Sequence, residues 1–567
     1  MSASEISGSP PTPAPWFRDV LLLALAFGAL YFFVLGRAPL ANPDEGRYAE
    51  IPRGMLATGD WVTPRLDGVN YFEKPPLMYW AVAASLNVFG LNEWAVRAVP
   101  ALFALGGVLL AYGAGRALRG RGAGIGAAVV LGTSLMYFAH ARIPILDTAV
   151  AVLMSAALFC FILAVRRPPG AARRWLFYGL YASAALATLT KGLIGFALTG
   201  LVMFVWLLVF NQWKRLRPLH LPTGAVLFLA IAAPWHVLVA ERNPAWARFY
   251  LVHEHWQRFT TTDHHRYHPF WYFIPFVFLG LFPWIGFLWP ALREELAGGW
   301  ARRKENAEAW FLAAWAAVIF LFFSKSQSKI EAYILPVFPP LAVLIGAWLA
   351  RRWEAAVLAP VRGGLMLFSI LCGLLAAGLV AIVLHPALVH NLDPGQAAAL
   401  KPYVLAAAAV LAGGGVIRPW IGPARGTKKA VLVMAGTTIL FYGILALAVP
   451  AIAPPDTKPL ALQVRALARP GDRVYHYHHF FHDFTFYARR TVGVVGYQDE
   501  LEPANDDPAR IRGRFIDDAQ FRREWSGPGR VFAAARKREV GALFADPSFH
   551  YHLLGETPDA YLFSNQN

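Results

Sequence analysis

Two short clusters of charged and aromatic residues lie in the loop that follows the first apolar segment of this 567-residue chain. They occupy residues 43–48 (PDEGRY) and 71–76 (YFEKPP). Cations such as Arg47 and Lys74 could neutralise a phosphate, because arginine binds anions through a planar fork and lysine acts as a compact point charge. The clusters therefore indicate a site for an anionic substrate.

Each cluster also carries a carboxylate beside its cation. Asp44 and Glu73 could orient a substrate amine or hydroxyl, act as a general base, or hold a divalent metal such as Zn, Mg or Mn. A simpler explanation is a solvated loop, in which Glu73 and Lys74 form a local surface ion pair that contributes little. Whether the two clusters can act together depends on the side of the membrane that they share.

The composition is that of a polytopic membrane protein. Hydrophobic residues make up 57% of the chain and charged residues only 15%, which is too apolar for the surface of a soluble protein. The shorter apolar stretch Leu77–Phe89 follows two prolines and is predicted to lie at the membrane interface. Stretches close to the ~20 residues that cross a bilayer predict thirteen helices at about 17–36, 97–115, 122–140, 146–165, 175–190, 192–210, 221–240, 270–292, 309–323, 331–350, 363–384, 401–417 and 430–453.

Arginine and lysine concentrate in alternate short loops, for example at 116–121, 166–174, 214–217 and 302–304. By the positive-inside rule these loops and the N-terminus are cytoplasmic, and the odd number of helices places the C-terminus outside. The net charge of +17 then reflects topology, so no nucleic-acid partner is expected.

The chain is predicted to have three parts. These are a cytoplasmic tail (1–16), a transmembrane domain (17–453) whose first extracytoplasmic loop spans 37–96, and an extracytoplasmic domain (454–567). Alternating apolar and polar residues in the last part predict a small α/β fold. Its histidines suggest a metal site, but their spacing matches no zinc pattern and no cysteine joins them, so a structural or surface role is favoured for His476, His478, His479 and His482.

Further polar residues fall on the extracytoplasmic side, namely Asp147, Lys191, His253, Arg258, Lys329 and Tyr333. No pool of nucleotide sugars or ATP exists there, so a lipid-linked donor carried by the membrane is the expected substrate. Lys191, Arg258 and Lys329 could join Arg47 and Lys74 in neutralising its phosphate. A transporter would instead place ionisable residues near the bilayer midplane on interrupted helices of related repeats.

Three motifs carry a resemblance to a known family. Residues 42–50 (NPDEGRYAE), 71–77 (YFEKPPL) and 328–336 (SKIEAYILP) resemble the motifs of bacterial lipid A aminoarabinose transferases. These enzymes belong, with the protein O-mannosyltransferases, to the polyprenyl-phosphate-dependent glycosyltransferases of the GT-C fold. The resemblance implies a GT-C membrane domain of about 13 transmembrane helices, followed by a small extracytoplasmic α/β domain.

The resemblance also implies roles for individual residues. Asp44 matches the family's first-loop acid, Arg47 a phosphate contact and Asp147 a further family acid, while Lys74 matches the lysine that binds the lipid phosphate. Glu73 matches a position that can hold a divalent metal, and no cofactor is expected to be required. The remaining matches to pocket positions are Tyr71, Lys191, His253, Arg258 and Tyr333.

The implied activity is transfer of 4-amino-4-deoxy-L-arabinose from undecaprenyl phosphate to a phosphate of lipid A. The enzyme would lie in the bacterial inner membrane with its site in the periplasm, and its product would weaken polymyxin binding. A related transferase that uses another sugar or another acceptor, such as lipopolysaccharide, glycan or protein, is the first alternative. A transporter or flippase is the second.

Overall fold

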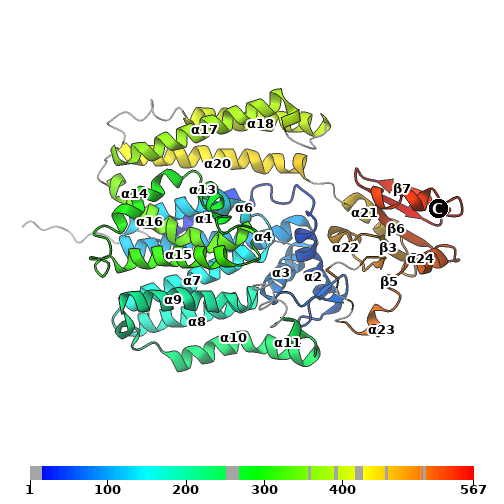
Figure 1. Ribbon diagram of the computed structural model, residues 1–567, viewed down its shortest axis with the longest axis horizontal. Helices are drawn as coiled ribbons and strands as arrows, with labels where there is room; N and C mark the ends of the chain where they lie inside the picture. Colours follow the sequence, from blue (N-terminus) through cyan, green and yellow to red (C-terminus); the bar gives the residue numbers. More distant parts are fainter. Residues whose placement is uncertain are drawn as a thin grey trace, which may run out of the picture.

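The computed structural model describes residues 16–250, 267–354, 359–388, 394–415, 426–453, 457–497, 500–501, 503 and 506–567. Long helices run roughly parallel to one another, and a sheet domain lies at one end of them (Figure 1). The helices of the membrane part are α1 (Trp16–Phe32), α4 (Glu93–Arg119), α5 (Arg121–Thr133), α6 (Leu135–His140), α7 (Leu146–Arg166), α8 (Ala171–Lys191), α9 (Ile194–Phe210), α10 (Leu221–Arg242), α11 (Trp246–Arg248), α13 (Phe273–Gly280), α14 (Ile285–Glu295), α15 (Ala307–Lys325), α16 (Phe338–Glu354), α17 (Arg362–Leu384), α18 (Pro394–Gly415) and α20 (Gly426–Ile452). Short 3-10 turns join them at η1 (Trp213–Leu216), η3 (Glu331–Val337), η4 (Ala359–Val361) and η5 (Pro386–Leu388).

The chain is a multi-pass membrane protein, but the predicted number of thirteen spanning helices is not confirmed. Within the described residues, eight helices are long and apolar enough to cross a bilayer, or nine if a bent pair counts as one span. That pair, α13 and α14, is bent by 98°. Each of the thirteen predicted stretches does fall on one helix or on two consecutive helices. The apolar composition of a stretch identified the helices, but it did not show where a stretch divides into two helices.

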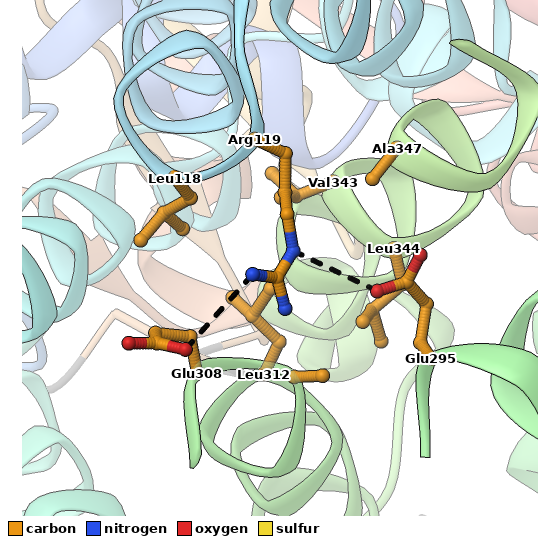
Figure 2. Close-up of a pocket in the computed structure, with 9 residues that line it drawn as sticks. Leu118, Arg119, Glu295, Glu308, Leu312, Val343, Leu344 and Ala347 are labelled. Carbon is orange, nitrogen blue, oxygen red and sulfur yellow. Dashed lines mark ion pairs between the residues drawn. The ribbon is translucent and has the colours of Figure 1, made fainter. Parts of the chain in front are cut away.

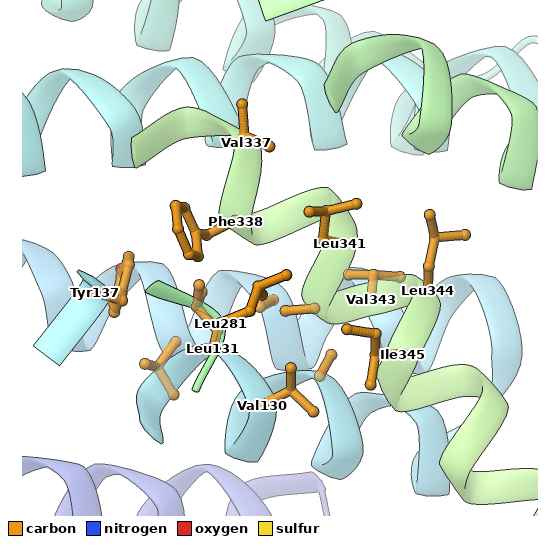
Figure 3. Close-up of a cluster of buried hydrophobic side chains, with 14 of the residues drawn as sticks. Val130, Leu131, Tyr137, Leu281, Val337, Phe338, Leu341, Val343, Leu344 and Ile345 are labelled. Atoms are coloured by element: carbon orange, nitrogen blue, oxygen red, sulfur yellow. The ribbon is translucent and has the colours of Figure 1, made fainter. Parts of the chain in front are cut away.

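α16 is the central helix of the membrane part. The span that contains it is 94% buried, whereas the span that contains α17 is only 17% buried and offers its surface to lipid. Figure 3 shows α16 side chains such as Phe338 and Ile345 against Val130 and Leu131 of α5. The backbones of these two helices come close at Gly126 and Gly346, where an added Cβ would lie 2.3 to 2.7 Å from backbone atoms of the other helix. Small residues thus allow the tight packing that stabilises helices in lipid.

The loop between α1 and α4 folds into α2 (Asp44–Thr58), a short hairpin of β1 (Arg65–Leu66) and β2 (Val69–Asn70), and α3 (Leu77–Phe89). α3 covers the predicted stretch Leu77–Phe89, and its place at the membrane interface stays a prediction. One buried arginine holds this loop to the membrane part, because Arg97 of α4 donates to both carboxylate oxygens of Glu45 at 2.9 and 2.6 Å. Its other donors reach the carbonyls of Leu35, Ala38 and Pro39.

The C-terminal domain has the predicted α/β fold. Its six-stranded sheet has the order β5-β4-β3-β6-β8-β7, in which β8 is antiparallel to both β6 and β7 and the other pairs are parallel. Its elements are α21 (Lys458–Leu467), β3 (Arg473–Tyr477), α22 (His482–Ala488), β4 (Gly493–Val495), α23 (Pro508–Ile511), β5 (Phe515–Ile516), α24 (Asp518–Trp525), β6 (Val531–Arg536), η7 (Lys537–Glu539), α25 (Gly541–Phe544), β7 (His552–Glu556) and β8 (Ala560–Ser564).

This domain shares a hydrophobic core with the first loop. Side chains of α2, α3 and the hairpin pack in one buried cluster with side chains of α21, α22 and the sheet. Polar contacts reinforce the junction: Asn42 donates to Asp483 at 2.6 Å and its own amide oxygen accepts from the Asp483 backbone at 3.0 Å. Buried Asp67 of the hairpin turn pairs with Arg514 at 2.7 Å. The loop and the domain therefore form one structural unit.

Gly46 should be essential to this junction. An added Cβ at Gly46 would lie 2.6 Å from backbone atoms of His482 and Asp483, whereas at Gly54 of the same helix the nearest atom is 3.7 Å away. We expect Gly46→Ala to destabilise the protein by about 1–3 kcal/mol because the two helices must separate. Gly54→Ala, the matched control, should be neutral or stabilising by up to about 1 kcal/mol. Thermal unfolding and limited proteolysis would measure both; equal stability of the two variants would contradict the close approach.

Candidate functional site

The start of α2 presents the first predicted acid and cation together. Asp44 is the first residue of the helix and is 57% exposed at its side chain, and Arg47 donates to it at 2.9 Å. The same guanidinium pairs with Glu500 of the C-terminal domain at 2.6 Å and lies 6.0 Å from the ring centre of Tyr71. Arg47 is therefore nearly buried and held between three groups, while Asp44 remains open to a substrate.

Glu500 was missed by the sequence analysis. It pairs with His482 at the start of α22 as well as with Arg47, so it joins the C-terminal domain to the first loop. Burial would raise the pKa of Glu500, but His482 and Arg47 outweigh burial and hold that pKa below its usual range. Nothing in the sequence signals the contact between Arg47 and Glu500, since more than 400 residues separate them.

The second motif lies directly before α3. Lys74 donates to the backbone carbonyl of Glu73 at 3.0 Å, and its ammonium is 3.6 Å from the Glu73 carboxylate. Tyr71 is buried, and its hydroxyl has no hydrogen-bond partner among the described residues. A buried hydroxyl of this kind favours a bound water or ligand group as partner.

A third pair comes from the membrane helices. Asp147 lies in the first turn of α7 and forms an ion pair with Lys191, the last residue of α8. The Lys191 ammonium also lies 4.6 Å from the ring centre of Tyr333 in η3. The structure thus brings together three predicted site residues from segments that are far apart in the sequence.

Tyr48 connects the acids of all three groups. Burial is the largest cause and raises the pKa of the Tyr48 phenol. Asp44, Glu73 and Asp147 raise this pKa further, and Arg47 lowers it. Such electrostatic effects require that the three carboxylates lie near one hydroxyl. The influence of all three acids on Tyr48 is consistent with one shared site, and their joint role stays a prediction.

Lys329 is engaged differently from the other cations. It is buried, donates to the carbonyls of Ser326 and His268 at 2.5 and 2.7 Å, and lies 5.6 Å from the ring centre of Tyr267. Burial lowers its pKa. A phosphate contact by Lys329 would require these bonds to open, so that role stays a prediction. His253 and Arg258 lie outside the described residues.

The C-terminal histidines point in different directions. His476 is buried and accepts a hydrogen bond from the Phe481 amide at 3.2 Å, while His478 lies 3.0 Å from Asp518 and His482 pairs with Glu500. The described part of the chain contains no group of three or more His, Cys, Asp or Glu side chains placed to hold a metal. Glu73 has the Lys74 ammonium beside it, which disfavours a second cation there, and a metal at Glu73 stays a prediction.

A separate pocket lies at the opposite end of α4. Arg119 reaches across it toward Glu295 at 3.8 Å and Glu308 at 4.0 Å (Figure 2). The volume of this pocket is about 10 Å³, roughly the space for one water. The 27 residues of α4 span about 40 Å. This pocket is therefore remote from Asp44 and Arg47, which lie at the Glu93 end of the helix.

The arrangement suits transfer of a group away from a phosphate. Arg47, Lys74 and Lys191 could stabilise negative charge that develops on a departing phosphate. Asp44, Glu73 and Asp147 could orient a positively charged or hydroxyl-bearing group beside it. Each cation has an acid beside it, so a substrate with both positive and negative charge fits these residues better than a simple anion.

Comparisons with known proteins are consistent with this chemistry. A family model of dolichyl-phosphate-mannose-protein mannosyltransferases matches residues 16–250, and a model of the aminoarabinose transferase C-terminal domain matches residues 460–558. The undecaprenyl phosphate-α-4-amino-4-deoxy-L-arabinose arabinosyl transferase of Pectobacterium carotovorum subsp. carotovorum (strain PC1) is 34% identical over 383 residues, which cover 67% of each chain. That of Edwardsiella ictaluri (strain 93-146) is 33% identical over 377 residues, or 66% of each chain.

A solved structure extends the similarity to nearly the whole chain. The crystal structure of ArnT from Cupriavidus metallidurans bound to undecaprenyl phosphate is 32% identical and has a TM-score of 0.85. The match covers 97% of this chain and 98% of that one. Both the membrane part and the C-terminal domain therefore have counterparts in one known protein.

The Glu500 ion pairs should stabilise the protein in a pH-dependent way. Because the folded-state pKa of Glu500 is below its usual 4.5, its stabilising effect is complete above that pH and is lost as the pH falls through the folded-state value. We expect Glu500→Gln to lower the Tm by roughly 2–4 °C at pH 7, with a smaller difference below pH 4.5.

The matched control is Glu556→Gln, since Glu556 forms an exposed pair with Lys537. That change should leave the Tm nearly unaltered at every pH. A Tm difference for Glu500→Gln that stays constant from pH 7 to pH 4 would show that its carboxylate charge is not what stabilises the junction.

Proposed function

The chain belongs to the undecaprenyl phosphate-α-4-amino-4-deoxy-L-arabinose arabinosyl transferase family, and we propose that it transfers this aminosugar from undecaprenyl phosphate to a phosphate of lipid A. The observation that carries the proposal is the pairing of each predicted acid with a cation: Arg47 lies beside Asp44, Lys74 beside Glu73 and Lys191 beside Asp147. This pairing supports a site that takes a lipid-linked phosphate together with an aminosugar.

In the proposed reaction, a phosphate oxygen of the acceptor attacks C1 of the sugar. The bond between C1 and the donor phosphate oxygen breaks, and undecaprenyl phosphate leaves with the electron pair. Lys74 and Arg47 stabilise the charge on the departing phosphate. Arg47 is well placed for this task because Glu500 fixes its position and Tyr71 shields it.

The acceptor phosphate is already anionic near neutral pH, so this reaction does not need a general base. Asp44 then has a different role: it orients the acceptor, stabilises positive charge on the sugar ring, or binds the 4-amino group. Its exposure at the first turn of α2 supports direct contact with a substrate. A hydroxyl acceptor would instead require a base, and Asp44 would be the candidate.

Lys191 has a more restricted role because Asp147 already neutralises much of its charge. Together they form a polar pair at the edge of the membrane helices, next to Tyr333. Such a pair can bind a sugar hydroxyl or share one phosphate oxygen without placing a net charge in the membrane.

The proposed location is the bacterial inner membrane, with the N-terminus in the cytoplasm and the site and the C-terminal domain in the periplasm. The lysine and arginine distribution supports this orientation. Lipid A that carries the aminosugar would have less negative charge. It would therefore bind cationic peptides such as polymyxin less strongly.

The first test is a mass measurement of lipid A. Wild type and Lys74→Ala would be expressed at equal abundance in a Gram-negative host that lacks its own transferase but makes undecaprenyl-phosphate aminoarabinose. We expect a pentosamine increment with wild type and at least a 100-fold smaller yield with Lys74→Ala, because the leaving phosphate loses its counter-charge.

The matched control is Lys401→Ala, an exposed lysine of α18, which should behave as wild type. Absence of the increment with a well-expressed wild type would favour another sugar or acceptor. Substrate movement without a new glycosidic bond would favour a transporter. An undiminished increment with Lys74→Ala would reject Lys74 as a phosphate contact.

Asp44→Asn tests the role of this acid. The charge is lost while the shape is kept, so we expect kcat/KM to fall about 100-fold with no change in the form of the pH–rate profile, because Asp44 does not act as a base. Asp559→Asn, at an exposed position of the C-terminal domain, is the control. Loss of the acidic limb of the profile in Asp44→Asn would instead identify Asp44 as a general base and point to a hydroxyl acceptor.

A further inference from the structure

A tight turn joins α15 to η3. The Ser326 amide donates to the Phe323 carbonyl at 3.1 Å, and the Ser326 hydroxyl donates to the Ser328 carbonyl at 2.9 Å. Within η3, the Tyr333 amide donates to the Ile330 carbonyl at 3.1 Å. The ring centres of Phe323 and Tyr333 lie 5.1 Å apart, so the two ends of the turn meet. The position of Tyr333 therefore depends on the shape of this turn.

Lys329 fastens the turn to a second segment of the chain. Its ammonium donates to the Ser326 carbonyl at 2.5 Å within the turn. It also donates at 2.7 Å to the carbonyl of His268, which lies 61 residues earlier in the sequence and shortly before α13. The His268 ring stacks on Tyr272 with ring centres 4.2 Å apart. One side chain thus links the chain that enters α13 to the chain that enters η3.

The surroundings of Lys329 offer its charge little compensation. The residue is 3% exposed. Among the described residues its ammonium meets two backbone carbonyls and, at 5.6 Å, the ring centre of Tyr267, and it forms no ion pair with a carboxylate. A buried ammonium is costly unless its hydrogen bonds are satisfied. An apolar side chain could fill the same space at lower cost, so the two hydrogen bonds are what the lysine contributes.

The turn leads directly to the polar pair of the membrane helices. Tyr333 presents its ring to the Lys191 ammonium, which lies 4.6 Å from the ring centre. Lys191 in turn forms an ion pair with Asp147. The attraction between a cation and an aromatic face requires that the two stay within about 6 Å. A displaced turn would therefore move Tyr333 and change how Lys191 is held.

We propose that Lys329 is a positioning residue, which fastens the segment before α13 to the turn before η3 and thereby holds Tyr333 over Lys191. The inference deepens the proposed function and rests on it, since Tyr333 and Lys191 are among the residues expected to meet the substrate. In this role Lys329 does not bind the donor phosphate. A phosphate oxygen would have to replace the carbonyl of Ser326 or of His268 as its partner.

A double-mutant cycle tests this role. The kcat/KM for pentosamine transfer would be measured for the full-length wild type, Lys329→Met, Tyr333→Leu and the double variant. Methionine is similar in length to lysine but donates no hydrogen bond, so we expect Lys329→Met to lower kcat/KM about tenfold through misplacement of Tyr333. In the Tyr333→Leu background the same change should cost less than about twofold, because the residue that Lys329 positions is already gone.

Two variants serve as controls. Lys325→Met changes an exposed lysine of the same turn and should match wild type. Lys329→Arg keeps the charge, but a planar guanidinium does not fit between the two carbonyls as the ammonium does, so it should not restore activity. Thermal unfolding would verify that each variant folds.

Restored activity in Lys329→Arg, or a full tenfold loss from Lys329→Met in the Tyr333→Leu background, would overturn the proposal and favour direct contact with the phosphate. Hydrogen exchange adds a measurement that needs no turnover. Lys329→Met should speed exchange of the backbone amides at the start of α13 and in η3, and Lys325→Met should not. Unchanged exchange would also overturn the proposal. Faster exchange in a protein that transfers no pentosamine would reject the proposed reaction and leave the link between the two segments standing.

Discussion

The buried ion pair between Arg97 and Glu45 sets the position of everything that follows it in the first loop. The Arg97 guanidinium donates to both oxygens of Glu45 and to three backbone carbonyls between Leu35 and Pro39. A charge in such a site is tolerated only because its hydrogen bonds are satisfied, and breaking such a pair costs about 3–5 kcal/mol. Since Glu45 lies between Asp44 and Gly46, the pair fixes the start of α2 against α4. Asp44 faces outward and Arg47 faces the C-terminal domain as a result.

From that starting point the site is assembled by packing over long distances in the sequence. The C-terminal domain adds Glu500, which holds Arg47, and His482, which holds Glu500. The membrane helices add Asp147 and Lys191 at the ends of α7 and α8. The C-terminal domain is therefore a part of the site, although its sequence resembles a separate appended module. Loss of the α2–α22 contact would displace Arg47 without changing any residue that meets the substrate.

Three sequence motifs predicted where acids and cations gather, because each motif places a carboxylate within a few residues of a cation. The structure places Arg47 beside Asp44 and Lys191 beside Asp147, while the roles of these residues stay predictions. The partners of Arg47 could not be predicted, since Glu500 is an ordinary acid in a polar segment. The sequence also did not show where an apolar stretch divides into two helices. α5 ends at Thr133, where the Leu135 amide donates to the Phe282 carbonyl at 3.0 Å. The Trp284 indole donates to the Thr133 hydroxyl at 2.9 Å. Such bonds depend on a neighbouring helix and leave no local pattern.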